Sequence, residues 1–265
     1  MITIGIDIGS NTSKGIVLKN GKTIAQTIFH TAFKEADRGK MVLQKLLKIS
    51  CLKKEEINCI IATGYGRVTV PFADKTITEI TCHAKGIYSL IPSVQTIIDI
   101  GGQDSKIIKL DEKGNVRDFV MNDKCSAGTG KFFEVTAHAL GIKLHDLSGL
   151  YFQSKSPCII NSTCTVFAET EIISLLSEKH ERKDIVAGLI ETMAKRIVNM
   201  SKGLKIKPEI AFAGGVAKNQ AMRAALENEL GCKFAIFDFD PQLTGALGAA
   251  LIAGTLKDQD LVNLG

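Results

Sequence analysis

The sequence has few aromatic residues and lacks the patterns that mark several classes of protein. It contains no tryptophan and only three tyrosines in 265 residues. No apolar run approaches the roughly 18 residues that a membrane-spanning helix needs, and no low-complexity segment or flexible linker interrupts the chain. The opening residues alternate like a strand and lack the basic and apolar segments of a secretion signal. We therefore expect a folded cytoplasmic protein with no membrane partner.

The charge of the chain argues against a nucleic-acid partner. Lysine and arginine number 33 against 28 acidic residues, which gives a net charge of +5. These charges are scattered, and no block of basic residues interleaved with aromatics offers a binding surface for nucleic acid. With 45% hydrophobic residues, a chain of this length can bury a real core and form two domains.

The seven cysteines include no Cys-x-x-C pair. An odd number without such pairs indicates neither a disulfide framework nor a conventional zinc site. Four of them adjoin apolar or helical stretches and are expected to be small buried thiols. These four are Cys51, Cys59, Cys82 and Cys232. Cys125, Cys158 and Cys164 remain as candidates for a functional role.

Cys125 and Cys164 have similar local surroundings. Cys125 lies in the polar run NDKCSAGTG at 122–130 and Cys164 in the run NSTCTVF at 161–167, and a helical pattern follows each. The positive end of a helix dipole would stabilise a thiolate there. Cys158 leads into a strand-like run and is the alternative to these two as a functional thiol.

Hydrophobic periodicity predicts a mixed α/β chain. Strands are expected at 3–8, 14–19, 22–29, 57–62, 94–99, 106–111, 116–121, 209–212 and 233–237. Helices are expected at 36–50, 83–91, 129–140, 168–179, 183–203, 217–230 and 243–253. Asn20 and Gly21 form the expected hairpin turn between the second and third strands.

The chain contains an internal repeat. Shifted by 92 residues, 6–18 aligns with 98–110 with identical residues at eight of 13 positions. Self-similarity of this kind signals duplicated structural units. We therefore predict two related lobes, at 1–95 and 96–265, with a final helix near 243–253 that could pack back on the first lobe.

Each lobe carries a carboxylate at the end of a strand, followed by a glycine turn. The runs are DIGSNT at 7–12 and DIGGQD at 99–104. Backbone N–H groups in such turns can wrap a phosphate. Facing each other across a cleft, Asp7 and Asp99 could hold a hard cation such as Mg²⁺. A pair of structural hairpins is the alternative.

Two more features complete the candidate nucleotide site. Lys14 and Lys106 occupy equivalent positions after the two turns. Either lysine could contact phosphate or simply flank a strand. Gly214 and Gly215 end a strand and open a helix, where a nucleoside could lie against bare backbone.

These motifs resemble those of the actin, sugar kinase and Hsp70 nucleotide-binding superfamily, an α/β fold in which two duplicated lobes enclose a nucleotide cleft. More closely, the chain resembles the ATPase activators (component A) of 2-hydroxyacyl-CoA dehydratases, a family that includes the ATP-binding subunits of benzoyl-CoA reductase. The matching runs cover nearly the whole chain and are DIGS at 7–10, TGYGR at 63–67, EITCHA at 79–84, DIGGQD at 99–104, NDKC at 122–125, AGTG at 127–130, CTVFAE at 164–169 and PQLTGALGAA at 241–250. The two cysteine runs are specific to this branch.

The resemblance implies an iron–sulfur cluster that bridges two subunits. In that family each subunit of a homodimer gives two cysteines to one [4Fe–4S] cluster on the two-fold axis, and the matching residues are Cys125 and Cys164. Four thiolates suit such a cluster, and an isologous dimer doubles the two that one chain offers. Cys158 as a ligand, and structural zinc shared across the dimer, remain alternatives.

The superfamily pattern also implies roles at the nucleotide. Asp7 and Asp99 would hold Mg²⁺ or its waters, and Gln103 would orient the attacking water, since a neutral amide can position a nucleophile. Phosphate contacts are expected from Ser10, Asn11, Thr12, Lys14, Gly101 and Gly102. Nucleoside contacts are expected from Gly214, Gly215, Asn219 and Gln242. The roles of Arg67 and His83 stay open.

The resemblance implies ATP-dependent one-electron reduction. MgATP hydrolysis would drive a low-potential electron from the cluster to an iron–sulfur partner, with ferredoxin or flavodoxin as the electron donor. The partner would be a 2-hydroxyacyl-CoA dehydratase, or another double-cubane cluster protein or acyl-CoA reductase. A small-molecule kinase and a zinc-bridged structural ATPase without a redox cluster are the other classes. The short chain lacks an evident sugar-binding insertion, which argues against the kinase.

Overall fold

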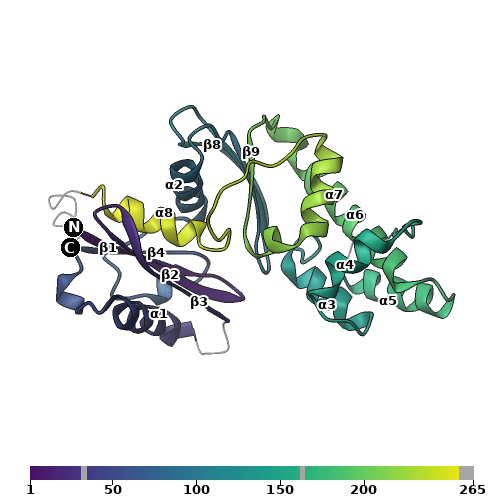
Figure 1. Cartoon of the computed structure of the whole chain (residues 1–265), viewed down its shortest axis with the longest axis horizontal. Coiled ribbons are helices and arrows are strands. Elements are labelled where there is room, and N and C mark those ends of the chain that lie inside the picture. Colours follow the sequence, from purple (N-terminus) through teal and green to yellow (C-terminus); the bar gives the residue numbers. More distant parts are fainter. Residues whose placement is uncertain (31–34, 162–164, 257–265) are drawn as a thin grey trace. The chain divides into compact units, whose positions relative to one another are not determined.

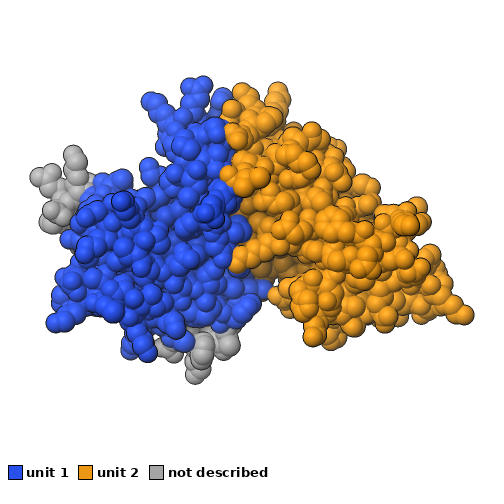
Figure 2. Space-filling view, viewed as in Figure 1, with its two compact units in different colours: residues 1–94, 110–117, 237–265 blue, residues 95–109, 118–236 orange. Residues whose placement is uncertain are grey.

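The computed structural model describes residues 1–30, 35–161 and 165–256. Within it the chain forms two compact units, coloured separately in Figure 2. Unit 1 consists of residues 1–94, 110–117 and 237–265, and unit 2 consists of residues 95–109 and 118–236. Each unit has its own sheet and its own hydrophobic core.

The sheet of unit 1 is built around an antiparallel meander. In spatial order its strands are β3 (Lys22–His30), β2 (Thr12–Lys19), β1 (Ile2–Ile8), β4 (Cys59–Thr63) and β5 (Lys75–Thr76). β4 runs parallel to β1, and β5 runs parallel to β4. Asn20 and Gly21 join β2 to β3 with φ angles of 51° and 77°. Both lie in the left-handed region that the tight hairpin turn requires, so the predicted hairpin is confirmed.

The sheet of unit 2 repeats the first four strands of this order. Its strands, in spatial order, are β8 (Val116–Asn122), β7 (Ser105–Leu110), β6 (Thr96–Ile100) and β9 (Ile210–Ala213). The antiparallel pair Asp7 and Lys14 of unit 1 corresponds to the pair Asp99 and Lys106 of unit 2. The predicted duplication is therefore confirmed down to the register of the strands.

Helices surround both sheets. Those of unit 1 are α1 (Glu35–Ser50), α2 (Glu79–Leu90) and α8 (Thr244–Ala253). Those of unit 2 are α3 (Gly130–Ala139), α4 (Asp146–Gln153), α5 (Thr165–Ser177), α6 (Arg182–Ser201) and α7 (Gln220–Leu230). Short 3₁₀ helices lie at Lys54–Glu56, Arg67–Thr69, Lys202–Leu204 and Gly215–Lys218. Among the residues described, no helix is both long enough and apolar enough to cross a bilayer.

Helix α8 comes from the far end of the chain and packs on β1, β4 and α2 of unit 1 (Figure 1). Small residues allow this approach. A Cβ on Gly5 of β1 would meet Ala246 O of α8, and a Cβ on Gly248 of α8 would meet Cys82 O of α2. These contacts leave no room for a methyl group, so a larger residue would force the elements apart.

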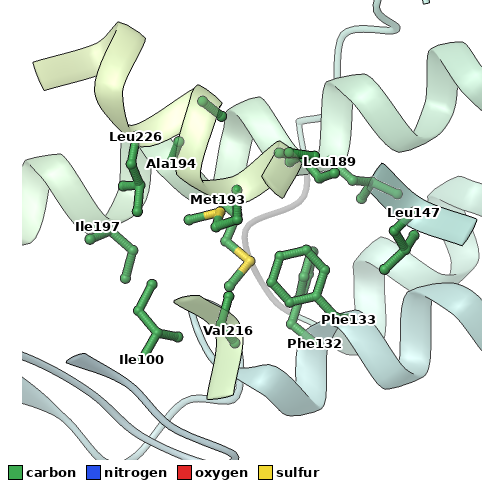
Figure 3. Packing of buried hydrophobic residues seen from close by; sticks show 14 of the residues in the cluster. Ile100, Phe132, Phe133, Leu147, Leu189, Met193, Ala194, Ile197, Val216 and Leu226 are labelled. Carbon is green, nitrogen blue, oxygen red and sulfur yellow. The ribbon is translucent and has the colours of Figure 1, made fainter. Parts of the chain in front are cut away.

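The core of unit 2 holds α3 against α6 (Figure 3). Phe132 and Phe133 of α3 lie with Leu189 and Met193 of α6 and with Leu147 of α4, and each is at most 4% exposed. Full burial of a side chain of this size contributes roughly 1.5–3 kcal/mol. The position of α3, and of the loop that leads into it, is therefore fixed by the core.

Two local predictions are wrong, and one helix is missing from the predicted elements. Residues 233–237 form no strand; Ala235 N donates to Ile210 O at 2.8 Å, but no ladder develops along this segment. Helix α4 is not among the predicted helices, because its 8 residues are too few to show a clear helical period. Cys51 is exposed, since α1 ends at Ser50 and Cys51 turns the chain with a φ of 54°.

Candidate functional site

The two predicted phosphate turns have the same backbone hydrogen bond. In unit 1 Gly9 N donates to Thr12 O at 3.0 Å, and in unit 2 Gly101 N donates to Asp104 O at 2.9 Å. The residues inside these turns are partly or fully exposed: Ser10, Asn11, Gly102 and Gln103. Each unit therefore presents a glycine turn to solvent directly after a buried strand.

Asp7 and Asp99 lie at the base of these turns and are 3% and 2% exposed. Lys14 Nζ lies 2.8 Å from Asp7 Oδ2, and Lys106 Nζ lies 3.3 Å from Asp99 Oδ2. Lys106 Nζ also lies 2.9 Å from Asp104 Oδ2. Burying a charge is costly unless it is paired, and each aspartate is paired across its antiparallel strand. The lysine positions are thus explained without a phosphate contact.

A glycine with left-handed backbone touches each carboxylate. Gly64 follows β4 with a φ of 86°, and Gly214 follows β9 with a φ of 84°. A Cβ on Gly64 would meet Asp7 Oδ1, and one on Gly214 would lie 2.7 Å from Asp99 Oδ1. Another residue would strain the backbone and displace the carboxylate. Sequence reasoning missed Gly64, although TGYGR places a glycine after a buried strand just as AGG does.

The residues predicted to contact the nucleoside are divided between the units. Gly214, Gly215 and Asn219 belong to unit 2, and Gln242 belongs to unit 1. Asn219 Oδ1 accepts a hydrogen bond from Met222 N at 2.9 Å and caps α7. Its carboxamide oxygen is therefore used in starting the helix. The nucleoside contacts stay predictions, as do those to phosphate.

Hydrogen bonds join the second phosphate turn to the N-terminus of α3. Gly101 O and Gly102 O accept from Gly130 N and Lys131 N, both at 2.8 Å. A Cβ on Gly130 would lie 3.0 Å from Gly101 O, so glycine permits this close approach. The first N–H groups of a helix have no partner inside it, and here the turn uses two of them. These two N–H groups therefore point to the turn and not to Cys125. This differs from the sequence-based expectation that the start of the helix stabilises the thiolate directly.

Asn122 organises the loop that carries Cys125. Its Oδ1 accepts from Cys125 N at 3.2 Å, and its Nδ2 donates to Cys125 O at 2.8 Å and to Ala127 O at 3.1 Å. One side chain thus fixes both backbone groups of the cysteine. Sequence reasoning missed this role; the signal available was an amide residue in a polar run before the helix.

The structure also joins the neighbours of the two predicted cluster ligands. Ser126 Oγ lies 2.9 Å from Thr165 Oγ1. Ser126 follows Cys125 in the chain, and Thr165 follows Cys164. Cys164 itself lies outside the described residues. This hydrogen bond brings the loop before α3 to the start of α5.

Three other cysteines have a raised pKa. Burial raises the pKa of Cys59 to about 11 and that of Cys82 to about 12. Burial, followed by the charge of Asp184, raises the pKa of the rival ligand Cys158. A thiol must lose its proton to bind a metal, so a raised pKa disfavours ligation by these three. Within 1–30, 35–161 and 165–256, no three His, Cys, Asp or Glu side chains are grouped to hold a metal ion.

Curated relatives match almost the whole chain. It is 44% identical over 253 residues to the 2-hydroxyisocaproyl-CoA dehydratase activator of Clostridioides difficile, covering 96% of this chain and 95% of the relative. It is 45% identical over 253 residues to the activator of lactoyl-CoA dehydratase of Anaerotignum propionicum, covering 96% of this chain and 97% of the relative.

Solved structures show the same fold. The activator of the 2-hydroxyisocaproyl-CoA dehydratase from Clostridium difficile, with bound ADPNP, has a TM-score of 0.88 at 44% identity and covers 96% of this chain and 94% of its own. Component A of the Acidaminococcus fermentans (R)-2-hydroxyglutaryl-CoA dehydratase has a TM-score of 0.91 at 41% identity, covering 96% and 97%.

A more distant structure supports the wider fold class. A glucokinase of the ROK family from Streptomyces griseus has a TM-score of 0.56 at 14% identity, covering 97% of this chain and all of its own. This likeness confirms the predicted fold of the sugar kinase type and carries nothing about activity. The BadF/BadG/BcrA/BcrD ATPase family matches residues 4–253. This chain therefore belongs to the BadF/BadG/BcrA/BcrD ATPase family.

Proposed function

We propose that this chain activates an iron–sulfur dehydratase by coupling MgATP hydrolysis to the delivery of one low-potential electron. Its family consists of ATPases, and relatives at 44% and 45% identity are named activators of dehydratases that act on CoA thioesters. A similar activator binds ADPNP, an analogue of ATP. Hydrolysis is needed because the electron must move from its donor to an acceptor of lower reduction potential. The proposed donor is ferredoxin or flavodoxin.

The observation that carries this proposal is the link between the second phosphate turn and the cysteine loop. Gly130 N and Lys131 N of α3 donate to the turn. The loop immediately before α3 carries Cys125 and is held by Asn122. A displacement of the turn by nucleotide would therefore be transmitted to the thiol through hydrogen bonds and one helix end. A simple kinase has no need for such a connection.

The chemistry of two carboxylates suits the Mg²⁺ ion that we propose. Mg²⁺ is held in nucleotide sites by one or two carboxylates together with phosphate oxygens and waters. Asp7 and Asp99 each provide one carboxylate beside a glycine turn. When bound, the ion neutralises charge on the transferred phosphate. Gln103, exposed on the second turn, is proposed to orient the attacking water.

The chemistry of the two cysteines suits the shared [4Fe–4S] cluster that we propose. Thiolates are the usual ligands of such clusters, and Cys125 is only partly buried. The Ser126–Thr165 hydrogen bond joins the residues after Cys125 and Cys164. We propose that a second copy of the chain supplies the other two thiolates. When bound, the cluster would supply the electron. The chain would hold the Cys125 thiol in place through Asn122.

The proposed partner is a 2-hydroxyacyl-CoA dehydratase in the cytoplasm. A double-cubane cluster protein or an acyl-CoA reductase would need the same low-potential electron and is the alternative. Anaerobic mixing of the reduced protein with 2-hydroxyisocaproyl-CoA dehydratase, its substrate and MgATP tests this choice. We expect dehydrated product with MgATP and none with MgADP. ATP hydrolysis without product for any 2-hydroxyacyl-CoA dehydratase tried would contradict the choice of partner.

A further inference from the structure

His83 is a buried histidine beside the first carboxylate of the site. It lies on α2 and is 6% exposed. Its Nδ1 lies 2.9 Å from Oγ1 of Thr244, a fully buried residue at the start of α8. Thr244 Oγ1 also donates to Pro241 O at 3.2 Å. One edge of the imidazole ring is therefore held by the N-terminal turn of α8.

The two helices that hold this ring are in backbone contact. A Cβ on Gly86 of α2 would meet Thr244 O, and a Cβ on Gly248 of α8 would meet Cys82 O. Helices that touch through glycines at two points cannot slide without a clash. The distance between His83 and Thr244 is therefore set by helix packing, which fixes the orientation of the ring.

The other edge of the ring borders Asp7. A Cβ on Gly245 would lie 3.0 Å from Asp7 Oδ2 and 3.2 Å from His83 Nε2. Both atoms therefore line the same small space, which Gly245 leaves free of a side chain. Asp7 Oδ2 is also the oxygen bound by Lys14 Nζ at 2.8 Å. Asp7 Oδ2 thus contacts a lysine of its own sheet and lies near the same point as the Nε2 atom of a histidine on a neighbouring helix.

The two halves of the repeat hold their lysines differently. In unit 2 Lys106 Nζ contacts both Asp99 and Asp104. The residue of unit 1 that corresponds to Asp104 is Thr12, which has no carboxylate. The first site therefore lacks the acidic side chain that anchors the lysine of the second. In the first site, His83 of α2 could instead hold the carboxylate of Asp7 in position.

We propose that His83 is a positioning residue that fixes the Asp7 carboxylate for the Mg²⁺–nucleotide complex. This inference rests on the proposed function, because it assigns Asp7 to Mg²⁺. The ring acts through Asp7 and does not contact the nucleotide. Thr244 holds the Nδ1 edge, Gly245 clears the path, and the Nε2 edge limits the rotation of the carboxylate.

Two substitutions separate the two edges of the ring. In His83→Asn the shorter amide replaces the Nδ1 edge, and in His83→Gln the longer amide reaches the place of Nε2. We measure the Kd of ADP calorimetrically with and without Mg²⁺. His83→Asn is expected to raise the Kd of MgADP about tenfold, which is about 1.4 kcal/mol. His83→Gln is expected to stay within about threefold of wild type, and without Mg²⁺ both variants bind ADP within about threefold of wild type.

The opposite pattern would overturn the inference. Normal MgADP binding by His83→Asn, or weak binding by His83→Gln alone, would show that only the link to Thr244 matters. If His83→Asn unfolds, as judged by circular dichroism, Gly245→Ala replaces it. That methyl group would press on Asp7 and His83, so we expect MgADP to bind about tenfold more weakly, and binding within about threefold of wild type would refute the role. Wild-type protein that does not bind MgADP would instead contradict the proposed function.

Discussion

Replacing Cys125 with serine is expected to abolish cluster assembly. After anaerobic reconstitution, we expect about four irons per dimer in wild type and less than about one in Cys125→Ser. The expected loss is large because the dimer would lose two of four ligands at once, and a hydroxyl does not replace a soft thiolate. Iron and acid-labile sulfide analysis, with the visible absorption spectrum, measures the effect.

Two matched variants control for the loss of a thiol. Cys51→Ser removes an exposed cysteine from unit 1 and should keep full iron content. Cys158→Ser removes the rival ligand, whose pKa is raised by burial and by Asp184, and should also keep it. A Cys125→Ser protein with wild-type iron content would exclude Cys125 as a ligand. Iron lost only in Cys158→Ser would assign the cluster to that residue instead.

Replacing Asp7 or Asp99 with asparagine is expected to reduce ATP hydrolysis by about a hundredfold or more, the size of effect seen when one preorganised charge contact is removed. Asparagine keeps the shape of the side chain but not the charge that would hold Mg²⁺. The steady-state rate of phosphate release, measured over a range of Mg²⁺ concentrations, tests this prediction.

Stability must be measured beside activity for these variants. In Asp7→Asn, Lys14 would lose the carboxylate that it contacts, and breaking a buried pair costs about 3–5 kcal/mol. In Asp99→Asn, Lys106 would keep its contact with Asp104. Asp118→Asn is the matched control, because Asp118 is exposed on β8 and accepts from Phe119 N through an oxygen that asparagine retains. A folded Asp99→Asn protein that hydrolyses ATP within about threefold of the control would refute the assignment.

The duplicated sheets could be predicted because their signals are local. Alternation of period two marks each strand, Asn20-Gly21 is a strong hairpin turn, and the repeat at an offset of 92 residues relates the two meanders. These signals do not require knowledge of distant contacts. The same reasoning failed at 233–237. This segment has the composition of a strand, but it makes too few backbone hydrogen bonds with β9 to form one.

The parts of the site that escaped prediction depend on long-range contacts. His83 and Thr244 are separated by 161 residues, and no periodicity brings them together. Gly64 is needed because β4 lies beside β1, which a single sequence does not reveal. Lys14 could be placed on a strand but not assigned a partner until the register with Asp7 was known.

The central claim is that nucleotide bound at the phosphate turns alters a cluster held by Cys125. The most direct measurement is the EPR spectrum of the reconstituted, dithionite-reduced dimer with MgADP and with MgADPNP. We predict a reduced-cluster signal that differs between the two nucleotides and is absent from Cys125→Ser. Identical spectra with both nucleotides, or no cluster signal in fully reconstituted wild type, would contradict it.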